Sequence, residues 1–465
     1  MQRLLAIAWL TWKAAFRFRL FLVLAVLLLG SVVALPLLIQ DDGTARGFTQ
    51  ILLTYTLSTI TGLLGFSTLW LACGTLARDI EEGQMQVLVT KPVARGQIWL
   101  GKWLGIVTLN AVLLALAGAG VYALLEWRAG RLPAEEQKAL RNEVLVARGV
   151  AGQNVNLAAL EEKTEAAVQA RLKANPDQQP YQNEVRKDIS GRLRGALQVV
   201  PAGSARQWQI NLGHPRSFFR DQPMQLRVKF NTADRNPNAT FDGLWQVGEA
   251  GSTNNFWPQD GPLALNMSPD TFHEIAIPAN LCDAQGRLSI LFINPTDTAL
   301  SFPLEDGIQV LFPEGGFALN YARGRGVIWC WLALLTALGL TAASFLSFPV
   351  AAFFSLGLLL VGLSSGTLAE AVGSGSVAAG NEETGAAGHS GADVILIPAF
   401  EGALAVINLA GDFSPIDALS TGRSIPWGEL GAAFAQIVLL LGGAIGLTGM
   451  FLFNRRELAT AQGTH

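Results

Sequence analysis

Six stretches of about 20 apolar residues, each without Asp, Glu, Lys or Arg in its interior, constrain this chain more than any other feature. A helix of about 20 apolar residues can cross the roughly 30 Å hydrocarbon core of a bilayer. Only 15% of the residues are charged, against about a quarter in soluble domains. The sequence therefore predicts an α-helical polytopic membrane protein with about six transmembrane helices, near residues 20–39, 51–76, 103–125, 327–346, 350–368 and 430–453.

Basic residues in the short loops predict the orientation of these helices, because cytoplasmic loops carry an excess of Lys and Arg. Four basic residues and no acid precede the first helix, four more lie between the second and third, and six crossings return Arg455 and Arg456 to the same side. We therefore expect a multi-pass protein of a cell membrane, such as the bacterial inner membrane, with both termini in the cytoplasm. The eight loop residues are Arg3, Lys13, Arg17, Arg19, Arg78, Lys91, Arg95 and Lys102.

The segment before the first transmembrane helix has an amphipathic pattern of its own. At about 100° per residue, its basic residues share one arc and its Leu, Ile, Trp and Phe residues cover the other side. This pattern is typical of a helix that lies in the membrane interface. The alternative is an extension of the first transmembrane helix. Either way, residues 1–126 form the first region of the chain, with three transmembrane helices and a cytoplasmic loop at 77–102.

Residues 127–324 are polar enough to form a separate domain outside the cytoplasm. Pro133 can begin a helix, and Leu157 to Lys173 form another after Asn156 as its N-cap. Farther on, apolar residues alternate with polar ones, which indicates strands. The sequence predicts an inserted extracytoplasmic α+β domain, a β-sandwich preceded by helices, with strands around Trp208–Leu212, Met224–Phe230 and Leu288–Ile293.

The last region, 325–465, carries the remaining three transmembrane helices and a cytoplasmic tail. An extracytoplasmic loop at 369–429 opens with Gly and Ser and has few large residues before Val394. Gly- and Ser-rich segments behave as flexible chains, so we expect a flexible loop.

Three aromatic residues of the inserted domain, Trp245, Phe256 and Trp257, have faces on which a sugar ring could stack. The alternative is that they belong to the core of the domain, as aromatic residues at strand spacing commonly do.

Other classes of function find little support. The 33 basic and 36 acidic residues nearly balance, which argues against a nucleic-acid partner. The three Cys and four His residues show no metal-binding spacing, and no nucleophile and base can be paired. We expect neither an enzyme nor a cofactor bound by this chain. Charge-free transmembrane helices also argue against a secondary transporter, which needs ionisable groups for its coupling ion.

The segment Thr75 to Lys102 is the most informative part of the chain. Arg78 to Val89 can form a short amphipathic helix that Pro92 ends, and Arg95 with Lys102 would hold the returning helix at the lipid headgroups. Such a rigid helix would be a contact surface, whereas the alternative is an inert solvated loop.

The motifs of this segment resemble the loop between the second and third transmembrane helices of ABC-type-2 permeases, and the tail around Phe413, Ile425-Pro426 and Arg455-Arg456 is similar to the family's last helix. The resemblance implies that the segment is a coupling helix that docks on an ATPase subunit. The inserted domain departs from the family's short loop. The expected docking residues are Arg78, Asp79, Glu81, Glu82, Gly83, Val87, Leu88, Lys91, Pro92 and Arg95.

The GxxxxGK pattern of Gly96 to Lys102 is not a P-loop, because Trp103 replaces the Ser or Thr that binds Mg²⁺ and no strand precedes it. ATP and Mg²⁺ are therefore expected in a partner, a cytoplasmic P-loop ATPase. The sequence and the resemblance together predict the permease subunit of an ABC exporter, half of a pathway completed by a second permease, identical or related. The alternative is a membrane-anchored binding or force-transmitting protein that an ATPase moves without substrate flux.

Overall fold

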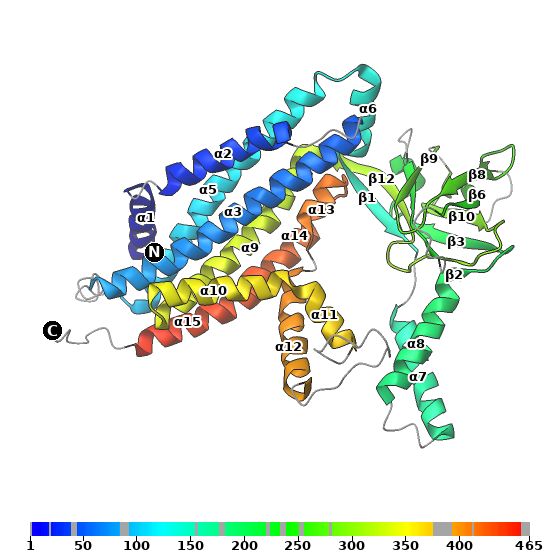
Figure 1. Ribbon diagram of the computed structural model, residues 1–465. Helices are drawn as coiled ribbons and strands as arrows, with labels where there is room; N and C mark the ends of the chain where they lie inside the picture. Colours follow the sequence, from blue (N-terminus) through cyan, green and yellow to red (C-terminus); the bar gives the residue numbers. More distant parts are fainter. Residues whose placement is uncertain are drawn as a thin grey trace. The chain divides into compact units, whose positions relative to one another are not determined.

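The chain forms two compact units in a computed structural model (Figure 1). The helical unit comprises Met1–Ala147 and Gly316–His465, and the insertion unit comprises Arg148–Gly315. The inserted domain, expected at 127–324, thus has its compact part at 148–315. The structure describes residues 2–17, 20–38, 44–83, 93–153, 157–175, 182–219, 224–232, 239–250, 255–278, 281–374, 393–411 and 413–456.

The helical unit is built of long apolar helices, and Figure 1 shows α3, α5, α9 and α15 running alongside one another. Their apolar sequences favour burial in lipid or against each other. The helices of this unit are α1 (Gln2–Arg17), α2 (Leu20–Leu38), α3 (Ala45–Glu81), α5 (Arg95–Ala129), α6 (Ala134–Glu143), α9 (Phe317–Phe345), α10 (Phe348–Leu363), α11 (Ser365–Ser374), α12 (Asp393–Gly411), α13 (Pro415–Ser420), α14 (Trp427–Ala433), the π-helix η3 (Phe434–Gly442) and α15 (Gly443–Arg455).

Small residues let these helices approach closely, as is common where transmembrane helices pack. A Cβ atom added at Gly339 of α9 would lie 2.7 Å from Cβ of Ala72 on α3. One added at Gly446 of α15 would lie 2.9 Å from the Trp99 ring of α5. The glycines therefore set the distances at two helix contacts.

Five described helices are long and apolar enough to cross a membrane by length and composition, and two shorter apolar helices lie within α2 and α10. The described part of every predicted transmembrane stretch is almost entirely helical, although 350–368 runs from α10 into α11 and 430–453 runs through α14, η3 and α15. The fold class of a helical membrane domain with an inserted sheet domain is confirmed.

One helix is longer than the predicted stretch, and one predicted loop was wrong. Helix α9 begins at Phe317, before the predicted transmembrane stretch at 327–346, so Arg323 and Arg325 lie within a helix that is long and apolar enough to cross a membrane. The flexible loop expected at 369–429 instead contains α12 and α13, and Leu396–Ser420 is itself apolar enough to cross a membrane. The sequence analysis did not predict this helix because it contains Pro398 and many small residues, but apolar helices tolerate proline.

Helix α1 is separate from α2 and runs in a different direction in Figure 1. One of its faces packs on α5, with Ile7 against Gly101 and Thr11 against Gly105. Its Leu5 and Trp9 are each 60% exposed. Helix α1 therefore packs on the protein with one face and exposes apolar side chains on another, as an interfacial helix requires.

The insertion unit contains two principal sheets, one ordered β1-β12-β4-β9 and one β3-β10-β6-β7 with β8 beside β6. A third, small sheet has the order β2-β11-β5. The strands are β1 (Val146–Gly152), β2 (Val199–Val200), β3 (Ala205–Asn211), β4 (Met224–Val228), β5 (Asn231–Thr232), β6 (Phe241–Glu249), β7 (Phe256–Trp257), β8 (Leu263–Met267), β9 (His273–Ile277), β10 (Arg287–Ile293), β11 (Leu300–Ser301) and β12 (Ile308–Gly316).

Alternating apolar residues of both principal sheets meet in one core, in which Trp208, Trp245 and Phe292 surround Phe302. The three strands expected from alternation correspond to β3, β4 and β10. Trp245 is 1% exposed and belongs to the core, as the second of the two interpretations predicted, so its face is not open to a sugar ring.

Two helices of the insertion unit, α7 (Leu157–Ala174) and α8 (Gln182–Gln198), pack through a small apolar core of their own. Helix α7 was expected at this position, whereas α8 and strand β1 were not. The short apolar pattern of β1 is interrupted by Arg148, which hid the strand.

Candidate functional site

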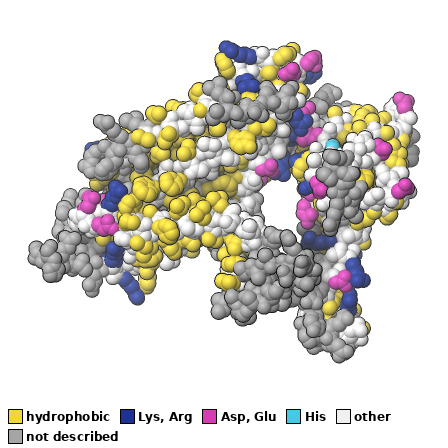
Figure 2. Space-filling view, in the orientation of Figure 1, with side chains coloured by type: hydrophobic (Ala, Val, Ile, Leu, Met, Phe, Trp, Pro, Cys, Tyr) yellow, Lys and Arg dark blue, Asp and Glu magenta, His cyan; other side chains and the backbone are white. Residues whose placement is uncertain are grey.

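The expected docking residues lie at one end of the helical unit, which we call the loop end. It is the end at which α3 ends, α5 begins and α15 ends. Figure 2 shows Lys, Arg, Asp and Glu side chains gathered here, while apolar side chains cover the visible flank of the helices. The charged residues of the loop end connect five helices, as the following contacts show.

Helix α3 continues unbroken to Glu81, so the expected separate helix beginning at Arg78 was wrong in its start. Leu76 and Ala77 keep the apolar period of α3 and are buried, which explains why the helix does not stop earlier. Glu82 is its C-cap, and Gly83 follows with φ of +71°. Glycine adopts this left-handed conformation without strain, and it commonly ends a helix there.

Asp79 forms an ion pair across the helices with Lys102 of α5, at 2.5 Å between Oδ2 and Nζ. Lys102 also donates to the Thr75 carbonyl at 2.8 Å. The Lys102 residue is only 7% exposed, so the expectation that it contacts lipid headgroups was wrong. A lysine this buried needs a partner, and Asp79 supplies it one helix away.

Glu81 and Arg78 both contact Phe348, the first residue of α10. The Glu81 carboxylate accepts a hydrogen bond from the Phe348 backbone N–H at 2.9 Å. The first N–H groups of a helix have no partner within it, so this contact satisfies one of them. The Arg78 guanidinium lies 4.4 Å from the centre of the Phe348 ring. The last turn of α3 is thereby joined to the start of α10.

Arg95, the first residue of α5, donates to three carbonyl oxygens at the end of α15: Phe453 at 3.2 Å, Asn454 at 3.0 Å and Arg456 at 2.8 Å. Arg456 in turn donates to the Ala343 and Ser344 carbonyls of α9. The last carbonyls of a helix lack partners within it, so both arginines complete a helix end. Displacement of the segment between α3 and α5 would therefore act on α9, α10 and α15.

Four expected docking residues, Val87, Leu88, Lys91 and Pro92, lie outside the described residues. Of the others, the structure places Arg78, Asp79, Glu81 and Arg95 in contacts within the chain, and Glu82 is exposed at the end of α3. The sequence analysis did not predict that Phe348 belongs to the loop end, and it predicted no partner within the chain for Lys102 or Arg456. Their partners lie between 23 and 267 positions away in the chain, and no local pattern encodes such distances.

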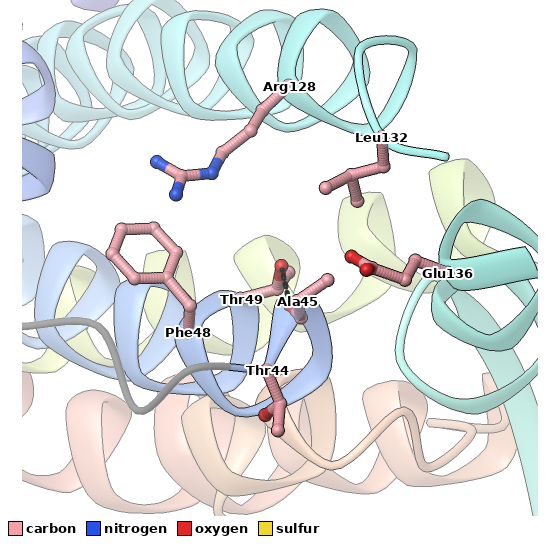
Figure 3. A pocket seen from close by; sticks show the side chains of 7 residues that line it. All are labelled: Thr44, Ala45, Phe48, Thr49, Arg128, Leu132 and Glu136. Carbon is pink, nitrogen blue, oxygen red and sulfur yellow. Dashed lines mark hydrogen bonds between the residues drawn. The ribbon is translucent and has the colours of Figure 1, made fainter. Parts of the chain in front are cut away.

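A pocket of about 110 Å³ lies at the opposite end, between the start of α3 and the end of α5 (Figure 3). The Arg128 guanidinium lies 3.6 Å from the centre of the Phe48 ring, with Leu132 and Glu136 on the side of α6. Sites for small molecules commonly measure about 300 to 1,000 Å³. This pocket is therefore too small to indicate a substrate site.

Comparison with known proteins agrees with this arrangement of helices. Residues 5–161 match the family described as ABC-2 family transporter protein. The matched segment contains α1, α2, α3, α5 and the loop end's ion pair. No curated protein and no solved structure matches the chain.

The resemblance to ABC-2 type permeases is thereby confirmed for residues 5–161, and the apolar helices agree with a multi-pass membrane protein. Permeases of that family are membrane subunits, and the family implies an ATPase partner in general.

Proposed function

We propose that this chain is half of a transmembrane export pathway, driven by a separate cytoplasmic P-loop ATPase that docks at the loop end. The ATPase would hold ATP and Mg²⁺, and a second permease, identical or related, would complete the pathway. In this arrangement the loop end and both termini are cytoplasmic, in the membrane of a bacterial cell. Lipid is the remaining partner, along the exposed apolar face of α1.

The observation that carries the proposal is the set of contacts joining the segment between α3 and α5 to three other helices. Glu81 holds the start of α10, Arg95 holds the end of α15, and Arg456 extends this chain of contacts to α9. A partner that moves the segment would move those helices with it. Packed connections of this kind can transmit a movement between helices, whereas a flexible loop cannot.

The docking test compares two pairs of adjacent acids at opposite ends of the helical unit. Glu81 and Glu82 are exposed at the loop end, and Glu135 and Glu136 are exposed in the first turn of α6. Breaking a desolvated interfacial charge pair costs about 2 to 5 kcal/mol, which is more than tenfold in affinity. Recovery of the ATPase from membranes should therefore fall by more than tenfold for E81K/E82K and stay unchanged for E135K/E136K.

Single variants separate docking from the capping of α10. Glu82→Lys should lower ATPase recovery, whereas Glu81→Gln should leave recovery largely intact and reduce substrate-linked ATP hydrolysis. Equal recovery for wild type and E81K/E82K would remove these carboxylates from the interface. ATP hydrolysis by the purified chain alone would contradict the whole assignment.

The insertion unit favours a second candidate function, because Arg148–Gly315 has its own sheets and core. In that candidate the ATPase moves the insertion unit and nothing crosses the bilayer. Reconstituted vesicles distinguish the two candidates. ATP-dependent accumulation or release of a solute would support export. ATP-dependent changes in the hydrogen exchange of the insertion unit, without any solute flux, would support force transmission. Cross-linking in membranes should give a permease dimer in either case.

A further inference from the structure

The last apolar helix of the described chain changes its hydrogen-bond pattern halfway along. Helices α14, η3 and α15 follow one another without interruption, and the whole segment Trp427–Arg455 is long and apolar enough to cross a membrane. Its middle part, η3, is π-helical over nine residues. π-Helices are rare, are mostly limited to a single turn, and are frequent at functional sites. A π-helix of this length therefore requires an explanation that a simple membrane crossing does not give.

The two halves of this segment belong to different clusters of buried residues. In η3, Ile437 and Val438 are buried in one cluster with Cys330 of α9. In α15, Phe453 is buried with Trp99 of α5 in a second cluster, which lies at the loop end. The change from one cluster to the other coincides with the end of η3. The π-helix and α15 are therefore packed on different parts of the helical unit.

Two glycines, Gly442 and Gly443, form the junction between η3 and α15. Close packing explains Gly446, where an added Cβ atom would lie 2.9 Å from the Trp99 ring. It does not explain Gly443, where no atom of the described chain lies within 4 Å of an added Cβ. Glycine weakens a helix relative to alanine, because its backbone loses more freedom on folding. The junction is thus a weak point in the helix that packing within the described chain does not require.

Helix α15 is held at its two ends by different helices. Near the junction, the Thr341 hydroxyl of α9 donates to the Ile445 carbonyl at 3.0 Å. At the far end, Arg95 of α5 donates to the carbonyl groups of Phe453 and Arg456. A movement of Arg95 would therefore carry the far end of α15 with it, while Thr341 keeps the near end in place.

We propose that the junction at Gly442 and Gly443 is a hinge, about which α15 tilts with the loop end while η3 stays packed beside Cys330. Sharp bends in helices occur at π-helical turns and at small residues such as glycine, and both are present here. A hinge needs only a few residues at the end of an element to absorb the change in φ and ψ. That an ATPase moves the loop end rests on the proposed function, whereas the hinge itself does not.

The test measures distances between two spin labels by pulsed electron paramagnetic resonance, in the purified full-length chain reconstituted in lipid without an ATPase. One label is attached through Tyr55→Cys in α3, and the other through Phe451→Cys in α15 or Leu439→Cys in η3. The three side chains are exposed, and the native cysteines are buried. Because α15 tilts and η3 does not, the distance from Tyr55 should be distributed more broadly to Phe451 than to Leu439.

Glycine variants connect this breadth to the junction. Gly443→Ala strengthens the helix at the hinge without a clash and should narrow the Phe451 distribution alone. The matched control is Gly431→Ala in α14, where no atom of the described chain lies within 4 Å of an added Cβ either; it should leave both distributions unchanged. Arg95→Gln releases the far end of α15 and should broaden the Phe451 distribution further.

Equal breadth at Phe451 and Leu439 in the wild type, or equal distributions in Gly443→Ala and Gly431→Ala, would overturn the hinge. Adding the ATPase with ATP tests the docking separately. A shift of the Phe451 distance without a shift at Leu439 would support both proposals. A Phe451 distance that does not shift, although its breadth still responds to Gly443→Ala, would contradict the docking and leave the hinge in place.

Discussion

The two ends of the helical unit use the same kinds of charged residues in opposite ways. At the loop end, Lys102 and Arg95 bind a carboxylate and helix carbonyls of the same chain. At the other end, Arg128, Arg323 and Arg325 lie over the rings of Phe48, Trp427 and Tyr321, and none of the three has a carboxylate partner among the described residues. At the loop end, cations therefore bind acceptors of neighbouring helices, whereas these three arginines of the other end lie against aromatic rings.

The direction of the helices explains the difference. Helices α3, α9 and α15 all end at the loop end, where their last carbonyl groups accept hydrogen bonds from cations. At the opposite end α3, α9 and α14 begin, and the first groups of a helix are N–H donors, which cannot accept a hydrogen bond from an arginine. These helices therefore offer free carbonyl acceptors at the loop end and not at the opposite end.

The largest effect should come from the buried pair Asp79–Lys102. Lys102→Met leaves Asp79 without its cation, and removing one partner of a buried pair costs about 3 kcal/mol. The free energy of unfolding in mixed detergent should fall accordingly. The double variant Asp79→Asn/Lys102→Met removes both charges and should recover most of the loss. A single variant as stable as wild type would show that the loop end is not held by its charges.

The next effect tests whether close packing also holds the helices together. Gly339→Ala forces a methyl group against Ala72, and overpacking costs about 1 to 3 kcal/mol. The control, Gly62→Ala, adds the same methyl to α3 where no atom lies within 4 Å. It should leave stability unchanged or raise it by up to about 1 kcal/mol. The free energy of unfolding, measured under identical conditions, should therefore fall in Gly339→Ala and stay the same or rise in Gly62→Ala.

A smaller effect is expected at Arg95, whose site is partly exposed. Arg95→Gln loses the charge that its three carbonyl contacts share, and because the site is partly exposed we expect these hydrogen bonds to contribute about 1 kcal/mol together, near the net value of one typical hydrogen bond. Because these contacts hold the end of α15, hydrogen exchange in residues 443–455 should quicken more than in α3. Uniform quickening in both helices would mean that Arg95 stabilises the unit without connecting α5 to α15.

The sequence predicted the helices and strands well because apolar length and alternation are local properties. The docking residues were predicted from the resemblance to a family. Their contacts could not be predicted from the sequence, because Arg95 and its acceptors lie about 360 positions apart. The start of α9 could not be read for a different reason. The predicted apolar stretch begins where the charges stop, and this excludes by construction any arginine in the first turns of the helix, such as Arg323 and Arg325.

The smallest effect is expected at an exposed ion pair, because solvent weakens the stability that such a pair contributes. Asp188 of α8 contacts Arg171 of α7 at 2.7 Å and Arg192 at 2.8 Å. The hydrogen bond from Arg171 is the main reason that the pKa of Asp188 is lowered. A lowered pKa adds stability above the unfolded value near 3.9, and this stability is lost as the pH falls through the folded value.

Hydrogen exchange of residues 182–198, corrected for its intrinsic dependence on pH, should therefore quicken only below about pH 4, the range set by the unfolded carboxyl pKa. In Asp188→Asn it should be slightly faster at neutral pH and lack this acid-dependent step. The change should be smaller than that of any loop-end variant, because solvent screens an exposed pair. If Asp188→Asn instead loosened α8 as much as Lys102→Met loosens α3 and α5, burial would not be what distinguishes the charges of the loop end.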